Sequence, residues 1–357
     1  HHQSIALQLS GTTQLPAFKK ATYFWPASAN AAMALITKSL FGNASAVSIA
    51  SIDSLELAFT TKFQSQANAA ALQTSVEFGR SVATAVFEWS KTDGGHEAYA
   101  HVTDPGYIPP TTPGSWVPTP AAFSQPVHPY WGNKRSFIAN SAAISQPAPP
   151  IPFSTDPQSP FFQMVNELYT VSKSLTKEDS ITTRFWGDLA VNMNVPAHGT
   201  NILTQCIVLK NFNLDEAAIT YAKHGIALNE AIISVFKTKY KYNQMRPISY
   251  IRTVMGHTEW NTTIPTPAHP EYSAAHAVVS SACATVLENI FGKQFKFTDH
   301  TYDASYGARS FNSFEDCAKE AAYSRLLAGI HYRPSIEIGL KQGRTVGEMV
   351  NKLKFRR

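Results

Sequence analysis

Residues 324–331 read SRLLAGIH, and this stretch decides how the rest of the chain is interpreted. The pattern predicts one helix from Phe314 to Ile330 with mostly apolar residues around Arg325. A charge in apolar surroundings is costly unless it has a partner, and a bound anion supplies one. If the last helical turn loosens near Gly329, Arg325 and His331 line the same cavity. We therefore expect an anion site at the end of this helix.

Residues 239–247 read KYKYNQMRP, and Lys239 and Arg246 in this stretch are two further candidate cations of the site. The pattern predicts a helix from Asp215 to Lys239, followed by a short link. Pro247 disfavours helix at Arg246, so that residue should be extended. Arginine offers a planar fork for two anion oxygens, and lysine offers a compact charge. A helix end followed by a turn can direct both cations at one point.

Residues 270–277 read PEYSAAHA and place a histidine at a predicted helix start. Ser273 is the candidate N-cap, and the helix is expected to run to Gly292. His276 then lies in the first turn, where unsatisfied backbone N–H groups favour a bound anion and a neutral imidazole. Ala274 and Ala275 leave the backbone open to an oxyanion. Three cations and two histidines together suit the binding of an oxyanion and proton transfer around it.

The composition excludes several other classes of protein. Of 357 residues, 44% are hydrophobic and only 15% are charged, so the chain is neither disordered nor typical of nucleic-acid binding. No apolar run reaches the length of about 18 residues that a membrane span needs. Abundant Ser, Thr, Asn and Ala with sparse Lys and Glu indicate an exported, periplasmic or secreted protein. Cys206, Cys283 and Cys317 form no CxxC pair and are expected to be buried free thiols.

The chain is predicted to be all-α and to form a single helical domain over residues 1–357. Its N-terminal helices fall within 16–90: one stops near Gly42, one starts at Ser51–Ser54 and one covers Ala67–Trp89. Residues 92–157 are rich in proline and aromatic residues, and they are expected to wrap the surface irregularly, rimming a cleft. Residues 158–357 form a helical core, with predicted helices over residues 161–174, 178–193, 200–212 and 215–239.

The three motifs, in this order, resemble the signature of the vanadium-dependent haloperoxidases. Type 2 phosphatidic acid phosphatases and bacterial class A acid phosphatases share this signature. Residues 113–120 and 129–132 are similar to the proline-rich segment of bacterial haloperoxidase-like proteins. Residues 25–27, 295–303 and 329–333 extend the resemblance over most of the chain. The N-terminal helices favour the haloperoxidase branch.

The resemblance implies a role for each motif residue. Lys239, Arg246 and Arg325 would bind the equatorial oxygens of vanadate or phosphate, and the backbone N–H near Ala275 would complete the cradle. His331 would bond to vanadium, or attack phosphorus as a nucleophile. His276 would be the acid–base group.

Two positions depart from the family pattern. The family usually has a serine where this chain has Ala274, and a lost hydrogen bond to a charged group costs about 1.5–3 kcal/mol. An aspartate commonly follows the last histidine by four residues and orients its ring, but here that position is Ser335. Glu337 is the nearest acidic alternative.

Three hypotheses follow from the resemblance and its departures. The first is a vanadate-dependent haloperoxidase that oxidises halide with hydrogen peroxide. The second is an acid-phosphatase-like phosphoester hydrolase that works through a phosphohistidine on His331. The third is a remodelled site with neither activity, because of Ala274 and Ala275. All three predict small-molecule substrates, no nucleic acid and no membrane span.

Three other polar groups receive no catalytic role from the sequence. His198 is expected to be a packed or exposed histidine. His269 precedes the helix of His276 and is assigned no function. Asp299, His300 and Asp303 lack a recognisable metal-ligand spacing and are expected to be loop residues.

Overall fold

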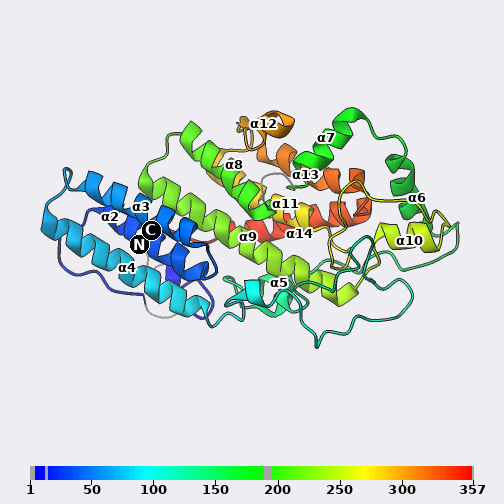
Figure 1. The fold of residues 1–357 in the computed structure, drawn as a ribbon, viewed down its shortest axis with the longest axis horizontal. Helices are drawn as coiled ribbons and strands as arrows, with labels where there is room; N and C mark the ends of the chain where they lie inside the picture. The colour runs from blue at the N-terminus through cyan, green and yellow to red at the C-terminus, as the bar shows by residue number, and fades with distance from the viewer. Residues whose placement is uncertain (1–4, 13–14, 189–193, 356–357) are drawn as a thin grey trace. The chain divides into compact units, whose positions relative to one another are not determined.

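The computed structural model describes residues 5–12, 15–188 and 194–355. Its contacts divide the chain into two compact units, His1–His101 with Lys354–Arg357, and Val102–Leu353. Both units are mainly helical (Figure 1), which confirms the predicted all-α class. The single-domain arrangement stays a prediction. No helix within the described ranges is long and apolar enough to cross a membrane.

The first unit is built from α2 (Trp25–Leu40), α3 (Ala46–Phe63) and α4 (Ala69–Ser90), followed by the short 3-10 helix η1 (Ala98–Ala100). The predicted start of the second helix at Ser51–Ser54 is wrong. Ser45 caps α3 instead, because its hydroxyl accepts the Ser48 N–H. Asn68 caps α4 in the same way, close to the predicted start at Ala67.

The second unit begins with a mostly irregular segment that contains η2 (Trp131–Asn133) and α5 (Ser141–Ile144). This segment is fastened to the helical core by buried side chains and backbone hydrogen bonds. Trp116 is fully buried, and its backbone N–H donates to the Asn243 carbonyl. The Met245 N–H donates to the Gly114 carbonyl at 2.8 Å. These bonds hold the segment beside the link that carries Arg246.

The helical core begins with α6 (Pro160–Ser172), α7 (Lys177–Phe185), α8 (Val195–Leu209), α9 (Leu214–Tyr242) and α10 (Pro247–Thr253). It continues with α11 (Ala275–Phe291), α12 (Asp303–Tyr306), α13 (Phe314–Leu327) and α14 (Arg333–Asn351). A two-stranded antiparallel sheet pairs β1 (Phe297–Asp299) with β2 (Arg309–Phe311), with Asp299 opposite Arg309. The predicted helix over 178–193 is too long, because α7 ends at Phe185; residues 189–193 lie outside the described residues.

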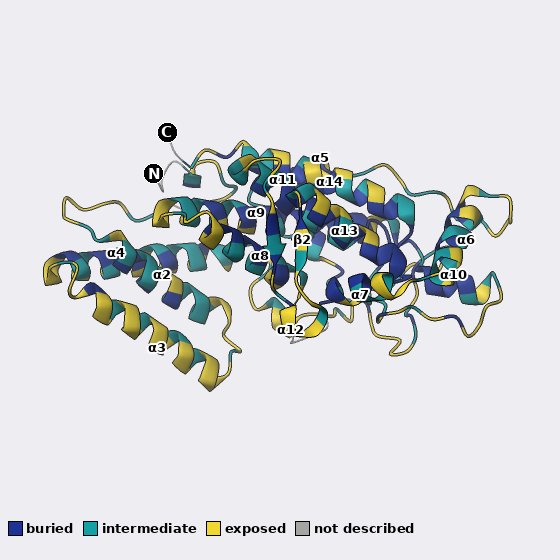
Figure 2. Cartoon of the chain, turned by 90° about the horizontal axis from the view of Figure 1, so that it is seen from above, coloured by how far each residue is buried: buried dark blue, intermediate teal, exposed yellow. Residues whose placement is uncertain are grey.

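Helix α11 is the centre of the core and packs against α9, α13 and α14 (Figure 1). Its approach to α14 is close because glycines recur every four residues on one face of α14. A Cβ at Gly343 would lie 2.2 Å from the Val278 carbonyl oxygen, and one at Gly347 would lie 2.7 Å from the Ala282 carbonyl oxygen. Figure 2 shows the resulting concentration of buried residues on these helices.

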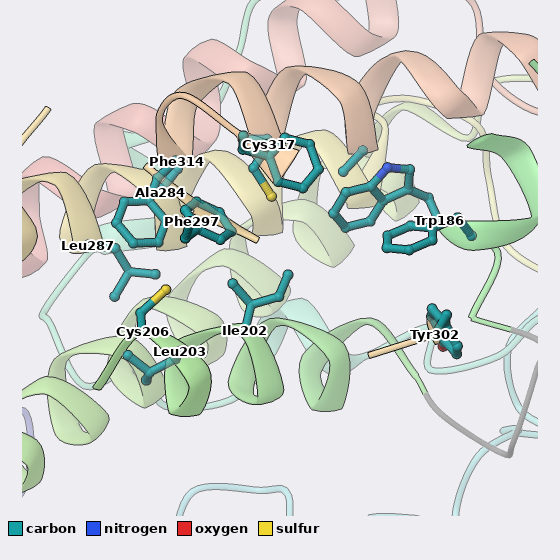
Figure 3. Packing of buried hydrophobic residues seen from close by; sticks show 14 of the residues in the cluster. Trp186, Ile202, Leu203, Cys206, Ala284, Leu287, Phe297, Tyr302, Phe314 and Cys317 are labelled. Atoms are coloured by element: carbon teal, nitrogen blue, oxygen red, sulfur yellow. The ribbon is translucent and has the colours of Figure 1, made fainter. Parts of the chain in front are cut away.

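Two buried apolar clusters support the ends of the core helices. One joins α8, α11 and α13 through an aromatic group in which Phe297 stacks on Phe314 at 4.8 Å (Figure 3). The other joins α6, α10, α13 and α14 around Tyr250 and Tyr332. The ends of α9, α11 and α13 carry the residues singled out by the sequence, so these clusters fix the backbone on which the site is built.

Candidate oxyanion site

The structure brings the predicted cations and histidines to neighbouring helix ends. Lys239 lies in the last turn of α9, His276 in the first turn of α11 and Arg325 in the last turn of α13. Arg246 is the N-cap of α10 with ψ 150°, the extended conformation expected before proline. His331 follows α13 and lies within 3.2 Å of Arg246, measured from Nε2 to Nη1.

His331 is held in one tautomer by two unlike partners. Its Nδ1 lies 2.8 Å from Glu271 Oε1, and its Nε2 lies 3.2 Å from Arg246 Nη1. A carboxylate accepts and a guanidinium only donates, so Nδ1 carries the proton and Nε2 keeps its lone pair. Burial, together with the charges of Arg246 and Lys239, holds the pKa of His331 well below its usual value. The imidazole is therefore neutral, and its Nε2 lone pair faces the cations and accepts the hydrogen bond from Arg246 Nη1.

Glu271 lies at the centre of the candidate site, although no role was predicted for it from the sequence. Its carboxylate is fully buried and accepts hydrogen bonds from His331 Nδ1, the Tyr332 N–H and the Ser335 hydroxyl. The position four residues after His331 thus contributes a donor to the carboxylate. Glu337, the alternative considered from the sequence, is exposed. Burial raises the pKa of Glu271 to about 7, and the charges of Lys239 and Arg246 oppose that rise.

Lys239 organises the segment that carries Glu271. Its ammonium donates to the carbonyls of Pro270, Glu271 and Ser273 at 2.9, 2.9 and 2.7 Å. These bonds use all three of its donors. Burial, followed by the nearby charge of Arg246, lowers the pKa of Lys239 well below its usual value. In this arrangement Lys239 adds positive charge to the site and joins α9 to the start of α11.

Arg246 likewise has every donor engaged. Nε donates to the His269 carbonyl at 2.9 Å, and Nη1 donates to the Ile330 carbonyl at 2.8 Å as well as to His331. Nη2 donates to the Pro267 carbonyl at 3.3 Å and to His269 Nδ1 at 3.0 Å. His269, to which the sequence assigned no role, is therefore a direct partner of the site.

Arg325 differs from the other two cations because most of its donors are available. It is buried, with its Nε donating to Ser324 Oγ at 2.9 Å and its Nη2 donating to the Thr183 carbonyl at 3.4 Å. The other three N–H bonds have no hydrogen-bond partner among the residues that the structure describes. Burial lowers its pKa to about 10, and the nearby Asp188 carboxylate counters this. A buried fork with free donors fits an oxyanion.

His276 and the start of α11 supply the remaining polar groups. His276 Nε2 lies 3.1 Å from the Trp186 carbonyl, which can only accept, so Nε2 carries the proton. Burial and the charge of Arg325 hold its pKa well below the usual value. The first intrahelical bond runs from the Val278 N–H to the Ala274 carbonyl, so the N–H groups of residues 275–277 have no intrahelical acceptor.

The predicted N-cap at Ser273 is wrong. Ala274 occupies the N-cap position and provides no side-chain hydrogen bond to the helix. The Ser273 hydroxyl instead donates to Gln342 Oε1 at 2.6 Å. Ser273 is therefore engaged elsewhere, and its hydroxyl does not replace the serine that the family usually has at position 274.

His198 and Asp299 form a second buried charged group next to the site. His198 Nδ1 lies 2.7 Å from Asp188 Oδ1, and its Nε2 lies 2.8 Å from Asp299 Oδ2. Although burial opposes the charge, the two carboxylates raise the pKa of His198 to about 9. The expectation that Asp299 is a loop residue is wrong, because it ends β1 and is fully buried. His300 and Asp303 form an exposed pair.

The donor set fits an oxyanion. Lys239, Arg246 and Arg325 are buried cations, and Glu271 is the one carboxylate bonded within this group in the part of the chain that the structure describes. An uncompensated buried positive charge favours an anion over a cation or a neutral molecule. No group of His, Cys, Asp and Glu suited to hold a metal cation occurs in the described ranges. This set of donors is therefore chemically suited to a negatively charged group.

Known proteins share the fold that carries these residues. The family model for the second helical-bundle domain of VCPO matches residues 219–356, which contain all the candidate site residues. A bacterial vanadium-dependent iodoperoxidase of known crystal structure is 31% identical, with a TM-score of 0.86, and the match covers 98% of this chain and 84% of the other. The chain belongs to the vanadium-dependent haloperoxidases.

More distant structures share the fold. A holo-type bacterial vanadium-dependent chloroperoxidase matches with a TM-score of 0.72 at 16% identity, covering 92% of this chain and 81% of the other. An apo-type bacterial vanadium-dependent chloroperoxidase matches with a TM-score of 0.70 at 14% identity, covering 98% and 91%. A search of curated proteins finds no match.

Proposed function

We propose that this protein uses bound vanadate to oxidise a halide with hydrogen peroxide, and that iodide is the first halide to test. The proposal rests above all on one observation. His331 presents the Nε2 lone pair of a neutral imidazole to a buried cationic group, while Glu271 fixes the proton on Nδ1. A neutral imidazole nitrogen is a metal ligand, and the carboxylate behind it raises its basicity.

The residues of the site would have different roles. His331 Nε2 would hold the vanadium atom, and the free donors of Arg325 with the N–H groups at the start of α11 would bind the oxyanion oxygens. Lys239 and Arg246 supply charge and orient the 267–273 segment. When bound, vanadate supplies a Lewis-acidic centre that activates peroxide toward halide. His276, neutral and in the first turn of α11, is placed to exchange protons at that centre.

Iodide is favoured by two considerations. The 31%-identical relative is a vanadium-dependent iodoperoxidase. Independently, Ala274 supplies no hydroxyl to an oxyanion oxygen, and Ser273 is committed to Gln342. A site with one hydrogen bond fewer stabilises charge on the oxyanion less well, and iodide is the halide that is easiest to oxidise.

The test is halide oxidation after reconstitution with vanadate. We expect iodide-dependent turnover of peroxide in the wild-type protein and none in His331→Ala. His300→Ala is the matched control, because His300 is an exposed histidine outside the site and should leave activity unchanged. Absence of oxidation with iodide, bromide and chloride would reject the proposal.

The phosphatase alternative uses the same groups, because a neutral His331 Nε2 can also attack phosphorus. An aryl phosphate assay on the same preparations separates the two functions. Hydrolysis that His331→Ala abolishes, without any halide oxidation, would replace the first proposal with this one.

A further inference from the structure

The start of α11 is supported by α14, the helix that follows His331 and runs alongside α11 (Figure 1). The Ala274 N–H donates to the Ser335 carbonyl at 3.2 Å. Gly339 allows the close approach, because a Cβ there would lie 3.0 Å from the Ala274 carbonyl oxygen and 2.9 Å from the Ala277 Cβ. Helix α14 therefore holds the turn whose N–H groups are expected to bind an oxyanion.

Gln342 is a buried glutamine of α14 that the proposed reaction does not use. Only 3% of the residue is exposed. Its Oε1 accepts the Ser273 hydroxyl at 2.6 Å, and its Nε2 donates to the hydroxyls of Ser234 and Thr238 at 2.8 and 3.0 Å. The Thr238 hydroxyl donates its own hydrogen to the Ser234 carbonyl, so it can only accept from the amide. This fixes the amide nitrogen toward α9 and the amide oxygen toward Ser273.

The same side chain closes a ring of contacts around Lys239. Lys239 follows Thr238 on α9, and its ammonium donates to the Ser273 carbonyl at 2.7 Å. Gln342 joins these two segments a second time, from the Thr238 hydroxyl to the Ser273 hydroxyl. All four residues are buried, so water does not compete for these bonds. Ser273 is therefore held at both its carbonyl and its side chain.

The position of Ser273 affects two parts of the candidate site. Its carbonyl is one of the three acceptors that orient the Lys239 ammonium, and its backbone leads directly into Ala274, the N-cap of α11. The groups of a binding site must lie within about 0.5 Å of their productive positions, and supporting hydrogen bonds provide that precision. A shift of Ser273 would therefore move the N–H groups of α11 relative to the cations.

We propose that Gln342 is a positioning residue of the oxyanion site, which holds Ser273 so that Lys239 and the start of α11 face one anion. It acts through Ser273 and not by touching the anion. This role rests on the proposed function only in requiring an oxyanion at the site, and phosphate serves as well as vanadate to test it.

The test is the affinity for phosphate, measured by calorimetry, with vanadate as the second ligand. Gln342→Met keeps the length of the side chain and removes its polar end. We expect the affinity to fall about tenfold, the loss typical of one misaligned hydrogen bond to a charged group. Ser273→Ala removes the same bond from its other side and should give the same loss even if Gln342→Met folds poorly. Gln146→Met is the matched control, because Gln146 Nε2 donates to the same Thr238 hydroxyl at 3.2 Å without reaching Ser273, and it should leave the affinity unchanged.

A double variant, Gln342→Met with Ser273→Ala, tests whether the two residues act together. If Gln342 acts through Ser273, the double variant should bind phosphate no more weakly than either single variant, whereas independent effects would add. Additive losses would therefore overturn the proposal. Unchanged or tighter phosphate binding in Gln342→Met would overturn it as well, and tighter binding would show that the released Ser273 hydroxyl donates to the anion.

The same measurements separate this role from the proposed function. Phosphate binding that Gln342→Met weakens, without halide oxidation by the wild-type protein, would reject the proposed function and support the role of Gln342. A wild-type protein that binds neither phosphate nor vanadate would overturn both.

Discussion

Two buried histidines near the site, His331 and His198, both bond to carboxylates, and yet the first is neutral and the second is positively charged. His331 meets one carboxylate, from Glu271, and its pKa is lowered by burial and then by the charges of Arg246 and Lys239. His198 meets two carboxylates at 2.7 and 2.8 Å, and its pKa rises to about 9. The comparison teaches that the sum of nearby charges, and not burial alone, sets the protonation state. One ring is left free to act as a ligand, and the other is a fixed charge.

Removing His198 should produce the largest effect on stability. His198→Leu leaves Asp188 and Asp299 buried without their shared cation, and breaking such a pair costs about 3–5 kcal/mol. Chemical denaturation measures the free energy of unfolding. His300→Leu removes a histidine from an exposed pair with Asp303 and should change that free energy by less than about 1 kcal/mol. Equal effects of the two substitutions would show that His198 is not a structural cation.

Raising the pH should destabilise the protein through the same residue. Unfolded, the His198 ring loses its proton near pH 6.5, whereas the folded ring keeps it up to about pH 9. The stabilisation is therefore complete below pH 6.5 and is lost as the pH rises through about 9. A difference of this size corresponds to about 3 kcal/mol. Denaturation curves between pH 6.5 and 9.5 should show this loss in the wild-type protein, and a curve that does not fall would contradict the assignment.

Replacing Glu271, the partner of His331, should lower the affinity for vanadate more than it lowers the stability of the fold. Glu271→Gln keeps the shape of the side chain but removes the carboxylate that fixes the Nδ1 proton. Loss of such a partner typically costs about 10–100-fold in metal affinity or activity, so vanadate affinity measured by calorimetry should fall by that factor. Glu337→Gln, an exposed carboxylate in α14, is the control and should bind vanadate like the wild type. Undiminished affinity in Glu271→Gln would remove Glu271 from the site.

The acid-side counterpart of the His198 effect concerns His224, whose pKa shift is of similar size and also corresponds to about 3 kcal/mol. The unfolded ring takes up a proton near pH 6.5, but the folded ring does so only near pH 4, so stability is lost as the pH falls across this window. His224→Leu should therefore lose less stability than the wild-type protein between pH 6.5 and 4. His224 thus gives a third case in the comparison, a histidine with no charged partner and a pKa set by burial. Parallel losses in both proteins would contradict this.

Local rules in the sequence predicted much of this arrangement. Proline at 247 predicted the extended backbone of Arg246, and helical periodicity predicted α9 nearly to its ends. The resemblance to the family marked the cations and His331. What the sequence could not predict depends on contacts between distant residues. Glu271 reaches His331 across 60 positions, and Asp299 reaches His198 across 101, so no spacing rule connects them.

The prediction of Ser273 as the N-cap of α11 failed for a different reason. Ser273 has the residue type that favours capping, but Gln342 on α14 takes its hydroxyl, and Ala274 occupies the cap position. A tertiary hydrogen bond therefore overrode a local preference. The three carbonyls that accept from the Lys239 ammonium could not be predicted either. They belong to an irregular segment about thirty residues further along the chain.

The protonation of His331 is the most direct test of this account. Nitrogen NMR of histidine-labelled protein at pH 8, where Glu271 is mostly ionised, distinguishes the two neutral tautomers from the imidazolium, with the signal assigned through His331→Gln. We predict a neutral ring with the proton on Nδ1 and a bare Nε2. A protonated Nε2, in either the other tautomer or the imidazolium, would contradict the claim that this nitrogen is free to hold the oxyanion centre.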